Sequence, residues 1–381
     1  MGGYRPRGDL KDYSTIISMG HRAFKKGMAM KTRALTLIVL AAGIMTLHLP
    51  AMAQKGGEST YSFLGLTTSA RVAALGGEVV SILDDDINLV FHNPALLNPE
   101  MHHHLSLNYV DYFAGVNYGY ASYGYSREGI GNFAAGMHYV NYGTFDRTDE
   151  LGEIQGTFRA AEYALNLFYS RPLIDSFLTA GINLKPIFSS FEQYNSFGIA
   201  LDAGLVYHNP GTYTTVGLVA KNVGFQVTSY TGHREKLPFE IQAGITQGLE
   251  HAPFRFSVTL QHLERWDLTY DLPGEEAVTT LNGAVERSRF DVFGDKLMRH
   301  VVLGTEFLLG KNFHIDLGYN YKRRKEMKVN ARPGMVGFSW GFGFRISKFQ
   351  VAFGRASYHL AGGTNHFSLT TNLSEFYRKR P

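Results

Sequence analysis

The sequence predicts an all-β protein: a 14-stranded antiparallel transmembrane β-barrel with an N-terminal plug segment. Three observations lead to this fold class. They are stretches that alternate apolar with polar residues, links between them that alternate between short and long, and an N-terminal run with the pattern of a signal peptide. Successive side chains of a strand point to opposite faces, so each stretch has one apolar and one polar face.

The alternation is clearest in residues 254–261. Every even-numbered residue there is Phe, Val or Leu, and every odd-numbered residue is Arg, Ser, Thr or Gln. Residues 239–246, 313–320 and 336–345 repeat the pattern. Alternation alone also suits a soluble sandwich, whose apolar face would be its core. Length favours the membrane, because a tilted strand needs roughly 9 to 11 residues to cross the hydrocarbon layer and soluble strands average about 5 or 6.

The links between the predicted strands also indicate a membrane barrel. Links after even-numbered strands are tight turns, whereas four links after odd-numbered strands are long: 143–157, 224–236, 265–298 and 324–334. Outer-membrane barrels have short turns at one rim and long loops at the other, outside the cell. The predicted strands cover residues 103–112, 115–127, 130–142, 158–171, 176–189, 196–208, 213–223, 237–248, 254–264, 299–309, 313–323, 335–345, 348–358 and 364–373.

The N-terminal residues resemble an export signal. Residues 30–33 give a charged start, 34–47 an apolar run, and 51–53 a small-x-small cleavage site. The run is well short of the roughly 20 residues of a membrane-spanning helix. We therefore expect this organisation: residues 1–29 an upstream extension outside the mature protein, 30–53 the signal peptide, 54–100 the plug, 101–373 the barrel and 374–381 a short basic tail.

Composition agrees with an outer-membrane barrel and excludes several other classes. The 22 Tyr and 27 Phe suit aromatic girdles at the two membrane interfaces, and 42 Gly leave room inside the barrel. The absence of Cys excludes thiol chemistry and Cys-based metal sites. A net charge of +4 is too small to indicate nucleic-acid binding. No motif indicates a cofactor or a catalytic set, so we expect a protein that is not an enzyme.

Residues 61–97 do not follow the alternation. In order, they contain Tyr-Ser-Phe-Leu at 61–64, an S-A-R-x-A-A-x-G stretch at 69–76, three aspartates at 84–86 and Asn-Pro-Ala at 93–95. This set resembles the N-terminal signature of the FadL-like outer-membrane barrels, in particular the PorV and PorQ branch of the Bacteroidetes type IX secretion system. The resemblance to the PorQ group continues through the barrel sequence. It departs from the family at Thr67 and Thr68, where the family often has Pro.

The resemblance implies a function. Members of the PorQ group are implied to hold a surface protein of the PorZ type at the outer leaflet, near the sortase PorU and its partner PorV, where cargo is joined to anionic lipopolysaccharide. The expected partners are then these proteins together with outer-membrane lipid and lipopolysaccharide, and the long outer links 143–157 and 265–298 would be the contacts. A second function stays open, because FadL relatives pass hydrophobic compounds through a barrel with an N-terminal hatch. Pro186, at the end of the predicted fifth strand, is the one hint of the kinked strand that such transport would need.

The candidate site residues belong to the plug and to the inward face of the barrel. Small apolar residues at 70–75 could fold inside a barrel, and Asn before Pro at 93–94 is a good helix start. A periplasmic tail is the alternative. Inward charges could pair with the plug, or form a solvated lining that balances its own charges. The plug residues are Ser69, Ala70, Arg71, Asp84, Asp85, Asn93 and Pro94, and the inward charges are Lys185, Asp202, Lys221, Glu240, Arg255, Glu306, Asp316 and Arg345.

Three further patterns are weaker. Arg323, Arg324 and Lys325 fall on a predicted outer loop, where lipopolysaccharide could meet them; a generic solvated loop is the alternative. The His tract at 102–104 resembles a metal tract, but on a strand only the first and third His share a face. The aspartates at 84–86 could bind calcium, although a capped turn is commoner and no hand-type ligand spacing follows. We therefore expect no metal site.

Overall fold

The computed structural model describes residues 59–174, 177–269, 289–310, 312–327, 334–359 and 362–377. The chain divides into two units, Met1–Ala53 and Gln54–Pro381, and the described residues all belong to the second. The predicted extension 1–29, the predicted signal peptide 30–53 and residues 54–58 lie outside the described residues.

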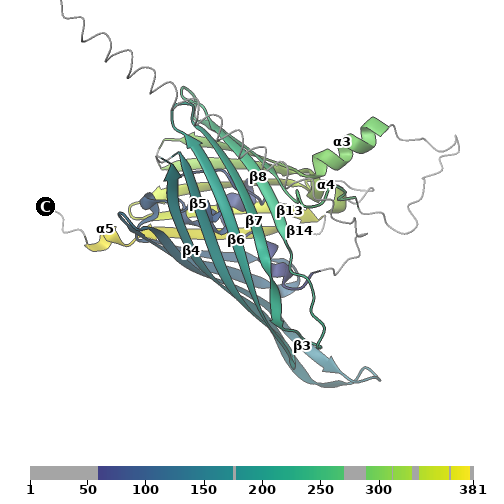
Figure 1. The fold of residues 1–381 in the computed structure, drawn as a ribbon. Helices are drawn as coiled ribbons and strands as arrows, with labels where there is room; N and C mark the ends of the chain where they lie inside the picture. Colours follow the sequence, from purple (N-terminus) through teal and green to yellow (C-terminus); the bar gives the residue numbers. More distant parts are fainter. Residues whose placement is uncertain are drawn as a thin grey trace, which may run out of the picture. The chain divides into compact units, whose positions relative to one another are not determined.

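Fourteen antiparallel strands form one closed barrel (Figure 1). Each strand pairs with its neighbours in sequence, and β1 closes the ring against β14. The predicted fold class, including the number of strands, is therefore confirmed. The strands are β1 His104–Asp111, β2 Asn117–Arg127, β3 Gly131–Thr148, β4 Ile154–Ile174, β5 Leu178–Phe191, β6 Tyr194–Asn209, β7 Thr214–Thr228, β8 Glu240–Gly248, β9 Phe254–Leu260, β10 Val301–Leu309, β11 Phe313–Asn320, β12 Phe338–Ile346, β13 Phe349–His359 and β14 Gly362–Asn372.

The two faces of the barrel wall differ in polarity. Outward side chains are large, apolar and exposed, such as Phe256 (43%) on β9 and Leu317 (56%) on β11. Inward side chains are polar and buried, such as Thr259 and Asp316 on the same strands. A closed barrel with a polar interior and an apolar outer belt is the arrangement of outer-membrane proteins. None of the described helices is long and apolar enough to cross a membrane.

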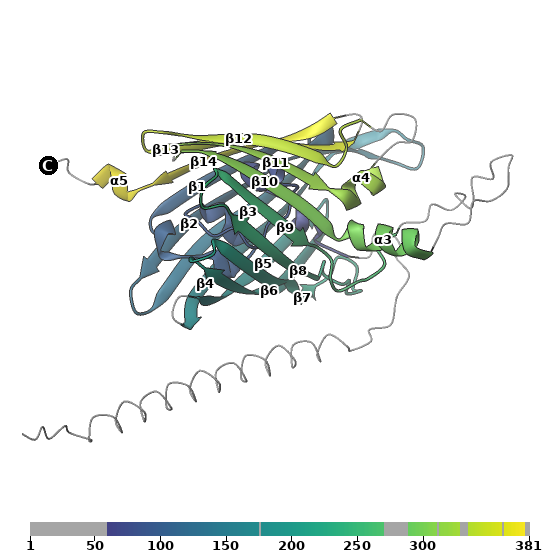
Figure 2. The ribbon, with the colours of Figure 1, turned by 90° about the horizontal axis from the view of Figure 1, so that it is seen from above.

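The long links lie at one rim of the barrel, as the sequence predicts, but this outer rim contains more secondary structure than the sequence predicts. The turns after even-numbered strands lie at the inner rim, near α5 (Ser374–Tyr377). The long links lie at the opposite end, together with a two-residue turn at 192–193 between β5 and β6 (Figures 1 and 2). The described parts of the long links contain two helices that alternation does not reveal, α3 (Arg289–Arg299) and α4 (Tyr321–Met327). The predicted eleventh strand therefore ends at Asn320 instead of residue 323.

The prediction of a loop at 143–157 is wrong. Strands β3 and β4 continue as a two-stranded hairpin, in which only residues 149–153 link them. A register shift between Asn141 and Gly143 explains the error, since an inserted residue interrupts the alternation that identifies a strand. Beyond the shift, Phe145 stacks on Phe158 with ring centroids 5.4 Å apart, which supports the hairpin.

The N-terminal segment is a plug, defined here as residues 59–103, and not a tail. It starts at a bridge between Ser59 and Lys236 of an outer link and ends at His103, just before β1 at the inner rim. Its elements lie inside the ring of strands (Figure 2). They are η1 (Ser62–Gly65), α2 (Ala70–Ala74), η2 (Ile87–Phe91), η3 (Pro94–Leu96) and η4 (Pro99–Met101); a further turn, η5 (Phe113–Gly115), links β1 to β2.

Candidate functional site: the plugged lumen

Glycines in the barrel wall let the plug backbone approach closely. A Cβ added at Gly217 would lie 2.0 Å from the carbonyl oxygen of Val80, and one at Gly318 would lie 2.2 Å from the amide nitrogen of Gly76. Gly354 faces the carbonyl of Ala70 at 2.1 Å in the same way. Any larger residue at these positions would displace the plug or the strand. The plug is therefore in direct backbone contact with the wall.

The short helix α2 lies against β12 to β14. Ser69 caps it by accepting a hydrogen bond from the amide of Val72 (3.4 Å). The amide of Ala70 donates to Ser368 of β14 (2.9 Å), and Ser339 of β12 donates to the carbonyl of Ala74 (2.8 Å). Wall hydroxyls thus satisfy helix-end groups that water would otherwise hydrate.

Arg71 of α2 is the centre of the first ion-pair cluster, defined as Arg71, Asp84, Asp86, Arg255 and Glu306. Its guanidinium contacts Asp84 (Nη2 to Oδ2, 2.6 Å) and Asp86 (Nη1 to Oδ2, 3.1 Å) of the plug. Its Nε contacts Oε1 of Glu306 on β10 at 2.9 Å. Arg255 of β9 bridges the same two partners, since it contacts Asp84 at 3.0 Å and Glu306 at 2.5 Å. Two wall residues are therefore tied to the plug through one network.

The burial of the charged side chains determines how much this network contributes to stability. The Arg71 and Glu306 side chains are 7% and 1% exposed. A buried ion pair adds little net stability relative to apolar residues of similar volume, but removal of one partner leaves an uncompensated buried charge and costs about 3–5 kcal/mol. The cluster therefore fixes where the plug sits more than how stable the barrel is.

A second ion-pair cluster, defined as Glu78, Lys185, Asp202 and Lys221, lies between the plug and β5 to β7. Lys185 contacts Asp202 of the next strand at 2.7 Å, with both side chains 1% exposed. Lys221 of β7 contacts Glu78 of the plug at 3.7 Å. His92 of the plug lies 3.4 Å from the same Glu78 carboxylate. This cluster ties the middle of the plug to the opposite side of the wall.

The Asn-Pro-Ala tripeptide works as the sequence predicts. The Asn93 side chain caps η3 by accepting from the amide of Ala95 (3.0 Å), and it donates to the carbonyl of Val80 (2.9 Å). Pro94 is the first residue of η3. A Cβ at Gly204 would lie 2.0 Å from the Asn93 amide oxygen, so the cap is pressed against β6.

The outer half of the lumen is filled by apolar side chains. Tyr61, Phe63 and Leu64 from the start of the plug are buried in one cluster with Tyr118 and Ile187 of the wall. The Tyr61 hydroxyl lies 2.5 Å from Ser196 Oγ, and Tyr118 donates to the carbonyl of Thr67 (3.0 Å). The apolar space beneath the outer links is therefore occupied by the chain itself.

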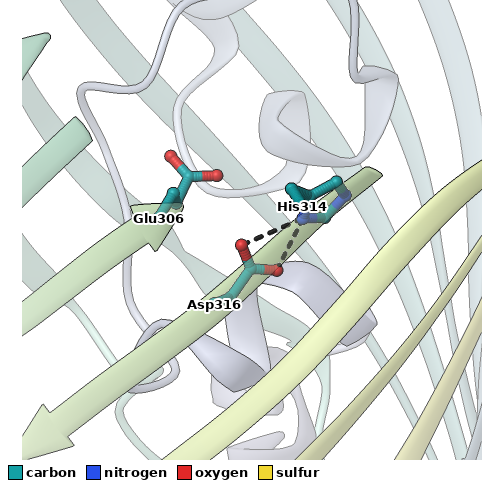
Figure 3. A group of neighbouring side chains, drawn as sticks. All are labelled: Glu306, His314 and Asp316. Atoms are coloured by element: carbon teal, nitrogen blue, oxygen red, sulfur yellow. Dashed lines mark hydrogen bonds and ion pairs between the residues drawn. The ribbon is translucent and has the colours of Figure 1, made fainter. Parts of the chain in front are cut away.

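Glu306, His314 and Asp316 have the donor types of a metal site. Their ligand atoms lie within 4.8 Å of one another, and Figure 3 shows the His314 ring directed at the Asp316 carboxylate. Nδ1 of His314 is 3.0 Å from each Asp316 oxygen. However, Glu306 uses both its oxygens for Arg71 and Arg255, whose positive charges would oppose a cation. The arrangement fits an ion-pair network better than a metal centre.

The remaining predicted inward charges differ in their surroundings. Glu240 is buried and accepts from Gln242 of its own strand at 2.8 Å. Arg345 does not line the lumen: it is exposed at the inner rim and contacts Glu375 of α5 at 3.1 Å. The alternation predicts that Arg345 lies on the inward-facing side of its strand, but it does not predict how far along the barrel axis the residue lies. Asp85 is half-buried beside the two plug aspartates that hold Arg71.

The basic run 323–325 lies on helix α4 and not on a loop. Lys325 contacts Asp295 of α3 at 2.8 Å, and Arg324 donates to the carbonyl of Val336 at 3.1 Å. Tyr321 and Arg299 also donate to Asp295. Partial burial would raise the pKa of Asp295, but these hydrogen bonds outweigh it and hold that pKa well below its ordinary value. Lys325 therefore docks α4 on α3, Arg324 ties α4 to the segment before β12, and Arg323 lies beside Gly77 of the plug.

Two site residues escape sequence reasoning. Glu78 had an available signal, because it is the one charged residue between positions 72 and 83, in a segment of otherwise small and apolar residues. Asn88 carries no such signal, yet its side-chain oxygen accepts from Ser106 and Asn108 of β1, both at 2.7 Å. An isolated charge in a segment that must be buried points to a partner in the wall.

Pro186 lies inside β5 and not at its end. It pairs with Ile199 of β6, but the register with β4 is interrupted between Ala164–Ile187 and Leu167–Leu184. Proline has no amide hydrogen to donate, so a break in the ladder on one side is expected. The β4–β5 seam is thus locally weakened beside the buried Lys185.

Comparison with known proteins gives similarity at the level of the barrel. No family model and no curated protein matches the sequence. Among solved structures, the chain is similar to the toluene transporter TbuX of Ralstonia pickettii (11% identity, TM-score 0.49, covering 82% of this chain and 100% of that chain). It is also similar to the toluene transporter TodX of P. putida (12%, 0.47, 81% and 99%) and to a FadL homologue of Pseudomonas aeruginosa (12%, 0.43, 80% and 98%). At such identities the similarity is one of fold.

Proposed function

We propose that this protein is a non-enzymatic outer-membrane component of a type IX secretion attachment complex, which anchors a surface protein of the PorZ type near PorU and PorV. The ordered N-terminal set, from the S-A-R-x-A-A-x-G stretch to Asn-Pro-Ala, supports the assignment by resemblance. The observation that carries an anchoring role is the plugged lumen. A barrel filled by its own N-terminal segment offers its rims, and not its interior, to a partner.

The outer rim has the ordered elements that a docked protein would need. The β3–β4 hairpin and helix α3 both project there (Figure 1). On α3, Phe290 and Phe293 are 81% and 52% exposed, and Phe293 packs on Trp266 with ring centroids 5.5 Å apart. Exposed aromatic side chains on an ordered support are typical of protein contacts. We therefore assign the partner surface to α3 and the hairpin.

The test alters the α3 part of this surface in the full-length protein. The double substitution Phe290→Ser and Phe293→Ser leaves the Asp295 contacts of α3 unchanged and is expected to reduce the amount of PorZ-type protein recovered after surface crosslinking of intact cells. Substitution of Tyr213→Ser, an exposed aromatic (49%) at an inner turn, is the matched control. Full recovery from the double variant, or equal loss from the control, would contradict the proposal. Steady phospholipid turnover by the purified protein would contradict its non-enzymatic part.

A FadL-like transporter of hydrophobic compounds is the second candidate, and the interrupted β4–β5 seam favours it. Transport would need the plug to move and the seam at Pro186 to open toward the bilayer. Uptake of labelled fatty acid by liposomes that carry the protein separates the two roles. Transport predicts uptake that increases with protein density, whereas an anchor predicts uptake equal to that of empty liposomes.

A further inference from the structure

We propose that the outward face of the β3–β4 pair carries a binding site for the phosphorylated headgroup of an outer-leaflet glycolipid. The face has a groove of about 490 Å³, lined by aromatic side chains below and by polar ones above. Its lining includes Tyr139, Asn141, Thr144, Arg159, Tyr163 and Ser190. The groove is independent of the plug and of helix α3.

The groove lies at the depth of the outer headgroups. β3 starts at Gly131 at the inner rim, and a tilted strand crosses the hydrocarbon layer in roughly 9 to 11 residues. The register shift at 141–143 therefore falls at the outer membrane edge, and the hairpin beyond it extends past the lipid. Tyr139 pairs with Tyr163 just below the shift, and their rings stack with centroids 4.9 Å apart. This is the position of an aromatic girdle, where ring faces meet the first acyl carbons.

The register shift between Asn141 and Gly143 leaves the space of the groove and determines which side chains line it. The Tyr142 side chain turns to Glu162, which faces the lumen, with a 2.5 Å hydrogen bond, so no bulky side chain fills the outward space beside Gly143. Arg159 pairs with Thr144 directly above the tyrosine pair, and its side chain is exposed. A cation directly above an apolar belt matches a lipid whose phosphate sits just above its acyl chains.

Arg159 is available for that phosphate. Its guanidinium forms no ion pair with any residue in the described part of the chain. The nearby acid Glu192 has its carboxylate 2.7 Å from Arg147, and its amide contacts only the backbone carbonyl of Arg159 (3.4 Å). An outward arginine at the headgroup level is thus left for a ligand anion, while Asn141, Thr144 and Ser190 can bond sugar hydroxyls.

The test compares lipid binding by the full-length protein with bisphosphorylated and dephosphorylated lipid A, using native mass spectrometry from detergent. We expect the wild type to prefer the bisphosphorylated form, and Arg159→Gln to lower that affinity about tenfold, the effect of one lost charge-assisted hydrogen bond. Arg159→Glu is expected to remove the preference. Arg171→Gln is the control, because Arg171 lies on the same outward face of β4 at the inner rim. Binding by Arg159→Gln equal to wild type, an equal loss from Arg171→Gln, or no preference for phosphate would overturn the proposal.

Discussion

Arg71 and Glu306 lie 235 positions apart in the sequence, yet Nε of the arginine donates to Oε1 of the glutamate over 2.9 Å inside the barrel. One residue belongs to the plug and the other to β10. The contact joins helix α2 of the plug to the tenth of the fourteen barrel strands. The contact ties the plug to the wall, so a change in either should affect the other.

Removal of the Arg71 charge should destabilise the whole protein. Arg71→Met leaves the buried Asp86 and Glu306 and the partly exposed Asp84 with only Arg255 as a cation, and we expect the free energy of unfolding to fall by about 3–5 kcal/mol. Urea titration in detergent, followed by the gel shift between folded and unfolded barrel, measures it. Arg127→Met, at an exposed inner-rim position, should change the midpoint little. Equal midpoints for wild type and Arg71→Met would contradict the role given to the cluster.

A single methyl group on the wall should displace the plug. Gly217→Ala places a Cβ 2.0 Å from the Val80 carbonyl oxygen, closer than any real contact, so the plug must shift away from β7. We expect the variant to become sensitive to protease within residues 60–100 while the barrel stays intact. Gly65→Ala is the control, since nothing lies within 4 Å of its added Cβ. Identical protease resistance of both variants would show that the wall and plug are not in close contact.

The Lys185–Asp202 pair should show strong coupling. Asp202→Asn keeps a hydrogen-bond acceptor for the amide of Asn222 but leaves Lys185 as an uncompensated buried cation, at a cost of about 3–5 kcal/mol. The double variant Lys185→Met with Asp202→Asn removes that charge and should recover most of the loss. Unfolding free energies of the two single variants and the double variant give the coupling. Additive losses would mean that the two side chains do not act as a pair.

Docking of α3 on α4 should be lost in acid. The pKa of Asp295 is depressed in the folded state, so its contacts contribute fully above the ordinary carboxyl pKa of about 3.9 and are lost as pH falls through the depressed value. Trp266 fluorescence reports α3, because its ring packs on Phe293; Trp340→Phe removes the other tryptophan. We expect a transition below about pH 4. Asp295→Asn should abolish the transition and Asp291→Asn should not; a transition that persists in Asp295→Asn would contradict the assignment.

Much of the barrel could be predicted because its pattern has period two. Alternation at 254–261 predicts both the strand and its inward face, and Arg255 of β9 and Glu306 of β10 lie in contact inside the barrel. The same pattern fails where it is interrupted. The inserted residue near Asn141 hides the β3–β4 hairpin, and helices α3 and α4 follow no strand rule.

The sequence predicts which charged residues belong to the site better than it predicts which of them pair with one another. Arg71 and the aspartates stand out as charges in a segment that folds inside a barrel, but which wall residue each one meets depends on strand stagger, which sequence does not give. Arg345 has the correct parity yet lies at the rim, because height in the barrel depends on where the strand starts. The close approach at Gly217 is equally hidden, since glycine has many other uses in a barrel.

The N-terminal segment of this membrane barrel closes its lumen. Electrical recording from planar lipid bilayers that carry the wild-type protein tests it most directly, with insertion verified by flotation of the same preparation with liposomes. We expect inserted wild-type protein to give no steady current above the bilayer baseline, and Gly217→Ala to give a measurable current. A steady, ohmic, porin-like current through the wild-type protein would contradict it.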